Sequence, residues 1–271
     1  MSTGANRYDL YESAVQSPER EARFLEALHG GEPTCLAEDF SGPASICRAW
    51  LAMGPRRTAI ATDIDPEPLE HAVHRLVQHL GREGVDRLEL CNANVLEAGG
   101  RPDIIAALNF GVCELHDRER LVTYFRHALF RLRAGGVHVV DLYGGENAYA
   151  PGVASCEIET PGGTLLYEWE QIDANPLTGR VLNAIHFTTP DGARMERAFA
   201  YDWRLWSVPE VRDAMREAGF ASTEVHAAMG GAEDGDGAII PSAVSTDHDD
   251  QPSRWPDDLE ESYVCFVVGR V

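Results

Sequence analysis

Lysine is missing from this 271-residue sequence, in which all 23 basic residues are arginine. Its absence excludes a Schiff-base lysine, a lysine general base and the phosphate-binding lysine of a Walker motif. Acidic residues outnumber basic ones by 44 to 23, which gives a formal net charge of −21. Such a charge repels phosphate backbones and anionic lipid headgroups, so we expect neither a nucleic acid nor a membrane surface as a partner.

Long apolar runs and paired cysteines are also lacking. No stretch approaches the roughly 20 apolar residues of a membrane span, and the N-terminal "MSTGANRYDLYES" has no apolar signal core. The six cysteines form no CxxC pair, which favours reduced thiols and a cytoplasmic protein. No metal site is expected, because Cys113 and His116 lack further ligands and "EDGDGA" lacks the spacing of a calcium loop.

The first half of the chain alternates between strand and helix patterns. Short apolar runs are followed by segments with helical spacing and with proline or glycine at their ends. This alternation predicts a doubly wound, Rossmann-like α/β sheet. The strand-like runs are "TCLAE", "TAIATDID", "RLELCNANV", "PDIIAALNF" and "VHVVDLYGG".

The pattern changes to period-two strands over residues 155–203. Turn signals such as "TPGG" and "PDGA" separate these strands, so we expect an antiparallel β-meander inserted as a cap. A helix and two further strands follow, and the polar, acidic segment 229–262 lies between those strands as a predicted loop. Without repeats or a low-complexity linker, residues 1–271 are predicted to form one domain.

The turn after the first strand, "EDFSGPA", should lie closest to a ligand, because open α/β sheets bind ligands at the carboxyl ends of their strands. Gly42 allows the backbone to approach a ligand, whereas Phe40 and Ala44 stand where further glycines are usual. Asp63 follows 21 residues after Gly42, at the end of the second strand. A carboxylate there can accept both hydroxyl groups of a ribose.

With these motifs the chain resembles the class I S-adenosylmethionine-dependent methyltransferases over nearly its whole length. The resemblance implies seven strands in the order 3-2-1-4-5-7-6, with the last two antiparallel. It also implies S-adenosylmethionine as the cofactor and a small molecule as the methyl acceptor. Glu38 takes the family's acidic position before the turn, and Phe40, Gly42 and Ala44 take its three glycine positions.

The resemblance also assigns roles around the cofactor. Glu38 and the Gly42 backbone would flank its amino acid end, Asp63 would hold the ribose, and Ile64 would pack on the adenine. In "NANVLE", Asn94 stands where an aspartate is common near the adenine amino group, and its carbonyl oxygen could orient the adenine. The further cofactor-binding residues would be Phe40, Val95, Asn109 and, in the N-terminal segment, Tyr11.

Three residues are candidates for chemistry on the acceptor. His186, in the meander, could deprotonate a hydroxyl or amine, and Arg204 could pair with an anionic group. His116 follows the fourth strand, where the resembling enzymes place groups that face the substrate. Each has a structural alternative: a histidine on a strand is often only partly exposed and structural, and Arg204 could bridge a carboxylate such as Asp202.

Two other functions remain open on the sequence. An NAD(P)-linked oxidoreductase would carry a fuller G-x-G-x-x-G turn, and a non-catalytic adenosine-ligand binder would lack an accessible pocket beneath the meander. The oligomeric state is also open, a homodimer being one possibility.

Overall fold

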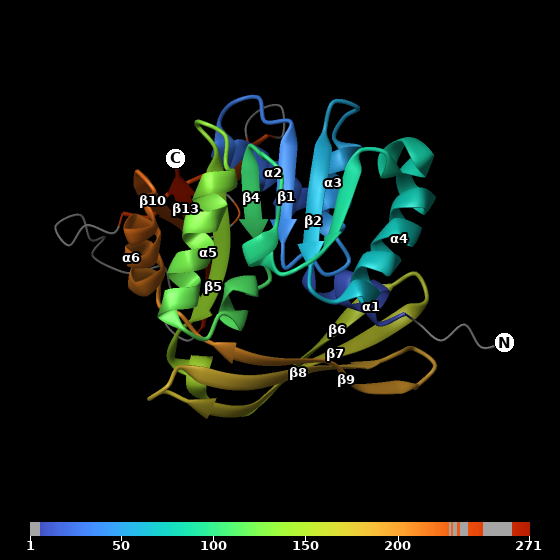
Figure 1. Ribbon diagram of the computed structural model, residues 1–271. Coiled ribbons are helices and arrows are strands. Elements are labelled where there is room, and N and C mark those ends of the chain that lie inside the picture. Colours follow the sequence, from blue (N-terminus) through green and yellow to red (C-terminus); the bar gives the residue numbers. More distant parts are fainter. Residues whose placement is uncertain (1–5, 228, 230–231, 234–237, 246–261) are drawn as a thin grey trace.

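The computed structural model describes residues 6–227, 229, 232–233, 238–245 and 262–271. Its main layer is a seven-stranded sheet in the order β10-β13-β5-β4-β1-β2-β3 (Figure 1). The strands from β3 to β5 are parallel, and β13 is antiparallel to both β5 and β10. The predicted strand order, with its antiparallel last pair, is confirmed. The strand bounds are β1 Cys35–Asp39, β2 Thr58–Asp63, β3 Leu88–Asn92, β4 Ile104–Ala107, β5 Val137–Gly144, β10 Ser222–His226 and β13 Tyr263–Arg270.

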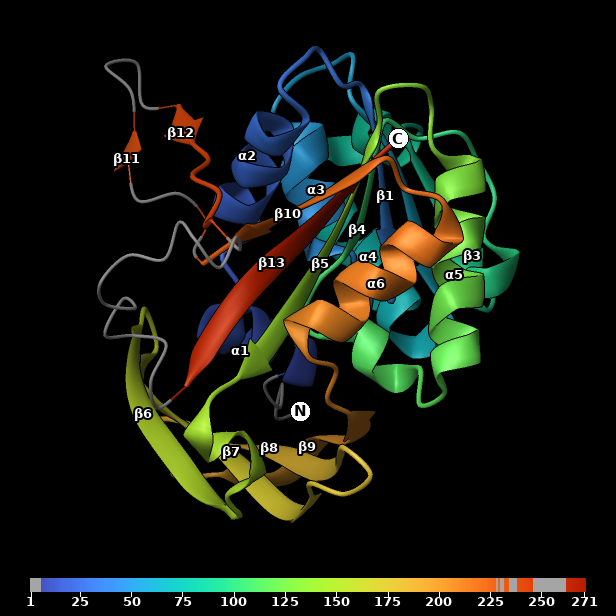
Figure 2. The ribbon, with the colours of Figure 1, turned by 90° about the vertical axis from the view of Figure 1, so that its left-hand side faces the viewer.

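Helices cover both faces of this sheet, as Figure 2 shows. One face packs against α2 (Pro18–His29), α3 (Ser45–Ala52) and α4 (Pro66–Val85), and the other against α5 (Arg118–Arg131) and α6 (Val208–Ala218). Local sequence sets the helix starts. Asp65 accepts a hydrogen bond from the Glu67 backbone at 3.0 Å and caps α4, and Ser207 and Glu210 form a capping box at α6.

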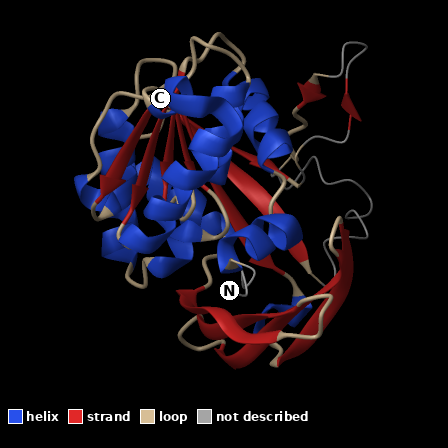
Figure 3. Ribbon diagram, turned by 90° about the vertical axis from the view of Figure 1, so that its right-hand side faces the viewer, coloured by secondary structure: helices blue, strands red, loops and turns tan. Residues whose placement is uncertain are grey.

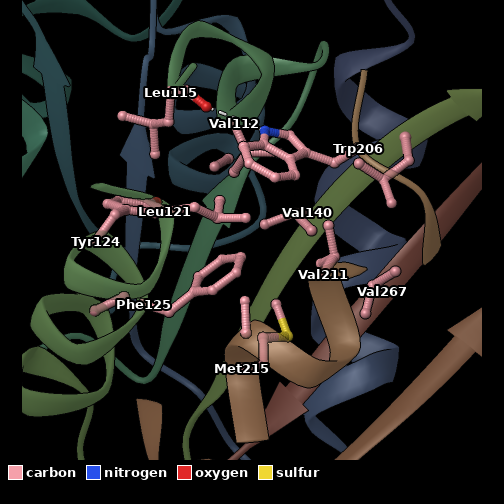
Figure 4. Packing of buried hydrophobic residues seen from close by; sticks show 14 of the residues in the cluster. Val112, Leu115, Leu121, Tyr124, Phe125, Val140, Trp206, Val211, Met215 and Val267 are labelled. Carbon is pink, nitrogen blue, oxygen red and sulfur yellow. Dashed lines mark hydrogen bonds between the residues drawn. The ribbon is translucent and has the colours of Figure 1, made fainter. Parts of the chain in front are cut away.

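The core on the α5–α6 side joins segments from both halves of the chain (Figure 4). Leu121 and Phe125 of α5 and Val211 and Met215 of α6 pack around Val140 and Val267 of the sheet. Trp206 lies fully within this cluster and donates a hydrogen bond to the Leu115 carbonyl at 3.1 Å. The segment after the meander is thereby fixed to the loop after β4.

The second layer is a four-stranded antiparallel sheet made of β6 (Gly152–Thr160), β7 (Gly163–Asn175), β8 (Arg180–Thr188) and β9 (Arg194–Arg204). It is the meander predicted from the period-two pattern. The arrowheads of β1, β2 and β4 in Figure 1 point toward it, so it lies below the carboxyl ends of the parallel strands. Figure 3 shows it as a layer of strands set apart from the helix-flanked sheet.

One helix and one pair of short strands were not expected from the sequence. Helix α1 (Arg7–Val15) forms in the polar N-terminal segment, where Asn6 accepts a hydrogen bond from the Tyr8 backbone at 2.9 Å. Within the predicted acidic loop 229–262, the short strands β11 (Ala232–Glu233) and β12 (Ile239–Ile240) pair, and Ile239 packs into the core beside α2. The remainder of that segment lies mostly outside the described residues.

None of the helices in the described part of the chain is both long and apolar enough to cross a membrane.

Candidate active site

The turn after β1 has an unusual backbone. Phe40, Gly42 and Ala44 have φ angles of 57°, 49° and 52°, all in the left-handed region that side chains rarely adopt. These are the three positions at which glycines were expected and only one was found. The turn therefore keeps the geometry that glycine favours, although Phe40 and Ala44 each pay about 1–3 kcal/mol for it.

Asp63, at the end of β2, is bonded to this turn. One of its carboxylate oxygens accepts the Gly42 backbone N–H at 2.7 Å, and the other accepts the Asp65 N–H at 2.9 Å. Desolvation raises the pKa of Asp63, although both N–H groups act in the opposite direction. Each carboxylate oxygen has a second lone pair, so the group can still accept two hydroxyl groups.

A second left-handed turn follows β4. Asn109 and Phe110 have φ angles of 57° and 64°, and their N–H groups both donate to the Asp141 carboxyl, at 2.9 and 2.7 Å. Burial raises the pKa of Asp141 to about 7. The two turns touch, because a Cβ at Gly111 would come within 2.9 Å of the Phe40 side chain. A residue without a side chain is therefore required at Gly111.

A cavity of about 700 Å³ lies between these turns and the meander. Ile64, an apolar side chain that is 71% exposed, lies on its wall. The meander contributes Phe199, Tyr201 and Trp203 to the opposite side. Eight of the predicted cofactor-binding residues line this one cavity: Tyr11, Phe40, Gly42, Asp63, Ile64, Asn94, Val95 and Asn109.

Asn94 has a second contact that the sequence did not indicate. Its side-chain oxygen accepts the Leu96 backbone N–H at 3.0 Å and caps the 3₁₀ turn η1 (Val95–Glu97). This is the oxygen that was expected to orient the adenine, and one of its lone pairs is already used.

Glu38 lies beneath the turn, and the described wall of the cavity does not include it. Its side chain is buried, and one carboxyl oxygen accepts the Cys47 backbone N–H of α3 at 2.9 Å. Burial raises the pKa of Glu38 to about 8, so the protonated form is favoured at neutral pH. In this position Glu38 links β1 to the start of α3.

His186 also lies away from the described cavity wall. Its Nδ1 accepts the Arg197 backbone N–H at 3.2 Å, and its Nε2 is 3.0 Å from the Glu170 carboxylate. Because Nδ1 is an acceptor, Nε2 carries the proton and donates it to Glu170. The register between β8 and β9 shifts at this position, and Arg197 has a φ of 48°. His186 thus holds an irregular stretch of β9 in place.

His116 and Arg204 both take part in hydrogen bonds between the loop after β4 and the end of β9. Neither is among the described residues of the cavity wall. Arg204 donates to the His116 carbonyl at 2.9 Å and lies over the Trp206 ring, with its Cζ 3.8 Å from the ring centroid. The His116 Nε2 is 2.6 Å from the Asp202 carbonyl oxygen. The pair fastens the end of β9 to the loop after β4. Asp202, considered as a partner for Arg204, instead pairs with Arg180.

Glu114 lines the cavity but was not singled out from the sequence. It belongs to the 3₁₀ turn η2 (Gly111–Glu114), and its Oε1 accepts the Trp203 indole N–H at 2.7 Å. Desolvation raises the pKa of Glu114, although the side chain remains accessible from the cavity. Its position two residues before His116 was the available signal, since that loop was already expected to face the substrate.

The described residues contain no cluster of three or more histidine, cysteine or carboxylate side chains suited to a metal ion.

Comparisons with known proteins identify the fold. No protein-family model and no curated protein matches the chain. Among solved structures, an S-adenosylmethionine-dependent methyltransferase from Clostridium acetobutylicum ATCC 824 has a TM-score of 0.66 at 13% identity and covers 97% of this chain and 96% of its own. The sugar N-methyltransferase KedS8 from Streptoalloteichus sp ATCC 53650 has a TM-score of 0.64 at 16% identity, covering 97% and 92%.

A third similar structure is CalS10 with S-adenosylmethionine bound, an amino pentose methyltransferase from Micromonospora echinaspora involved in calicheamicin biosynthesis. It has a TM-score of 0.64 at 14% identity and covers 97% of this chain and 96% of its own. The fold is therefore that of the class I S-adenosylmethionine-dependent methyltransferases, as the sequence resemblance implied.

Proposed function

We propose that this protein is an S-adenosylmethionine-dependent methyltransferase that acts on a small-molecule acceptor in the cavity below the meander. The main support is one arrangement: Asp63, the left-handed turn around Gly42 and the exposed Ile64 all lie on the wall of a single cavity. Asp63 offers a carboxylate that can accept hydrogen bonds from hydroxyl groups. The turn lets a ligand come close to the backbone, and Ile64 offers an apolar surface. Together they match the ribose, the methionine portion and the adenine of the cofactor.

The residues present fit this cofactor. Asp63 keeps a free lone pair on each carboxylate oxygen for the two ribose hydroxyls. Ile64 and Val95 would pack against the adenine, and Asn94 would contact its polar edge. When bound, S-adenosylmethionine supplies a methyl group on a sulfonium, whose carbon–sulfur bond breaks with its electron pair left on sulfur.

The main contribution of the protein is to hold the acceptor close and in line while excluding water. Phe199, Tyr201 and Trp203 of β9 close the cavity on the side opposite the parallel strands. Fixing two reactants in this way is worth about 7–11 kcal/mol of the activation barrier. The meander therefore serves as a cap.

Glu114 is proposed to accept the proton of the attacking group. Three carboxylates line the described cavity wall, and of these Asp65 caps α4 and Asp63 would hold the ribose in this proposal. Glu114 has one oxygen fixed by Trp203 and remains accessible. Glu114→Gln, which retains an acceptor for Trp203, should lower turnover by about 10²–10⁴-fold and leave S-adenosylhomocysteine binding unchanged.

Cofactor binding is tested by calorimetric titration of S-adenosylmethionine, S-adenosylhomocysteine, NAD and NADP into the pure protein. We expect the two sulfur ligands to bind, and Asp63→Ala to weaken them by about 1.5–3 kcal/mol through the loss of charged hydrogen bonds. Asp213→Ala, which removes an exposed carboxylate on α6, is the matched control. Binding of a nicotinamide cofactor without either sulfur ligand would support an oxidoreductase instead.

A non-catalytic binder would retain cofactor affinity and transfer no methyl group. The accessible cavity beneath the meander speaks against that alternative. The free cysteines, of which Cys35, Cys47, Cys113 and Cys265 are buried, suit the reducing cytoplasm, where we place the enzyme.

A further inference from the structure

A second cavity, of about 350 Å³, adjoins the first. Among the described residues, Tyr11, Tyr201 and Trp203 line both cavities, so these side chains lie between them. Its other described walls come from β5, β7, β8 and β13, from Val15 at the end of α1, from Phe110 in the turn after β4 and from Ser262. The two cavities therefore meet at Trp203, whose indole N–H is bonded to Glu114.

Aromatic rings with ordered orientations surround this second cavity. Tyr201 and Trp203 are stacked, with centroids 4.4 Å apart, and Trp169 is tilted by only 26° from Tyr201. Tyr143 and Phe110 stand across from this row and meet the rings nearly edge-on: Tyr143 lies at 86° to Trp169, and Phe110 at 68° to Trp203. These rings pack directly against one another, and the surfaces they leave free give the cavity a largely aromatic wall, which suits a flat ring.

The polarity of the second cavity argues against a charged or strongly polar occupant. None of its described lining residues carries a charge, and the polar side-chain groups are tyrosine hydroxyls, the Trp169 and Trp203 indole N–H groups and Ser262. The Tyr143 hydroxyl already accepts a hydrogen bond from Asn183 at 3.3 Å, and the Trp203 N–H donates to Glu114. A sugar or a phosphate needs several donors or charges around it, whereas a flat apolar ring needs none.

We propose that the second cavity binds a flat, apolar ring of the methyl acceptor, and that the acceptor's nucleophilic atom extends past Trp203 into the first cavity beside Glu114. This inference rests on the proposed methyltransferase function and goes beyond it by naming the acceptor class. The acceptor would differ from the sugars named for two of the similar structures.

The test compares two probes by calorimetry: 2-naphthol, a flat apolar ring, and glucosamine, a polar one. Both are titrated into the protein saturated with S-adenosylhomocysteine, and again into the free protein. Val264→Glu places a charge at the cavity from a position on β13 that is 44% exposed, so the core packing is kept. Val153→Glu, at a 61% exposed valine on β6 outside both described cavities, is the matched control.

We expect 2-naphthol to bind more tightly than glucosamine, and Val264→Glu to weaken it by about tenfold or more, since a ring would then displace a hydrated charge. Val153→Glu should match the wild type, and neither substitution should change S-adenosylhomocysteine affinity. Tighter glucosamine binding, or equal 2-naphthol affinity in the wild type and Val264→Glu, would overturn the ring site and leave the cofactor site standing. If the wild type does not bind S-adenosylhomocysteine, the proposed function is overturned, and with it the acceptor role of the second cavity.

Discussion

The backbone N–H of Gly42 donates a hydrogen bond to the Asp63 carboxylate at 2.7 Å. The bond joins the turn after β1 to the end of β2, and the Ser41 N–H strengthens the link by donating to the Thr62 carbonyl at 3.0 Å. Asp63 and the turn around Gly42 therefore form one rigid unit. A substitution at Gly42 or Asp63 should therefore change the position of the other residue.

Gly42→Ala should lower the free energy of unfolding by about 1–2 kcal/mol, because alanine is strained at a φ of 49°. No atom lies within 4 Å of the added Cβ, so the cost is one of backbone conformation alone. Urea denaturation measures it. Gly54→Ala is the control, since Gly54 has equal space and no positive φ, and it should be neutral or slightly stabilising. Equal effects at both glycines would contradict this account of the turn.

Gly111→Ala should disturb the cavity as well as stability. Its Cβ would lie 2.9 Å from three atoms of the Phe40 side chain, and both residues line the first cavity. We expect a loss of about 1–3 kcal/mol in unfolding free energy and weaker S-adenosylhomocysteine binding. Gly99→Ala, where the Cβ meets open space, is the comparison for both measurements. Unchanged ligand affinity in Gly111→Ala would show that Phe40 is not needed at the site.

Stability should fall as pH rises from about 6.5 to 8. The pKa of Glu38 is about 8 in the folded protein, against roughly 4.3 in an unfolded chain. Between these values the folded state binds more protons than the unfolded state, so raising the pH favours unfolding. Buried His138, whose pKa is lowered to about 4, acts in the opposite direction only below about pH 6.5.

Urea denaturation at several pH values across this window, without ligand, measures the effect. Glu38→Gln keeps an acceptor for the Cys47 N–H and loses the titration, so its stability should depend less on pH than that of the wild type. Parallel curves for the two proteins would mean that Glu38 is ionised when folded.

His186→Ala should destabilise the protein by about 1–3 kcal/mol, because the Arg197 N–H and Glu170 each lose a partner. This outcome follows from the role of His186 in holding β9. A variant with wild-type stability and no methyl transfer would instead support the role as a base that the sequence suggested. Denaturation and turnover, measured on the same preparation, separate the two.

The strand and helix patterns of the sequence were enough to predict the doubly wound sheet and the meander, because each element carries its own period, whereas the strand order came from the family resemblance. Helix α1 was missed because its sequence is polar and it gains its stability from contacts: Leu10 and Tyr11 pack on the meander. That Gly42 and Asp63 lie together was predictable because the carboxyl ends of neighbouring strands converge, whereas Ile64 was assigned from the family resemblance.

The acceptor side was harder to predict. His186 alternates with Ile185 and Phe187 on β8 and so lies on the opposite face of the strand from Ile185, which lines the second cavity. The period-two pattern could therefore have indicated that His186 faces away from the cavity. The same holds for Arg204, which follows the cavity-lining Trp203 on β9. Nothing local could indicate that Glu114 meets Trp203, which is 89 residues further along the chain, since that contact depends on how the meander docks.

The meander leaves the main sheet after β5 and returns before α6, so it is one continuous excursion of the chain. Four of the eight described rings that line the second cavity belong to this excursion, namely Tyr167, Trp169, Tyr201 and Trp203, whereas Asp63 and the turn around Gly42 belong to the first two parallel strands. Under the proposed function, exchanging residues 152–204 would replace half of the rings that face the acceptor and leave in place Asp63 and the turn around Gly42, which are proposed to hold the methyl donor.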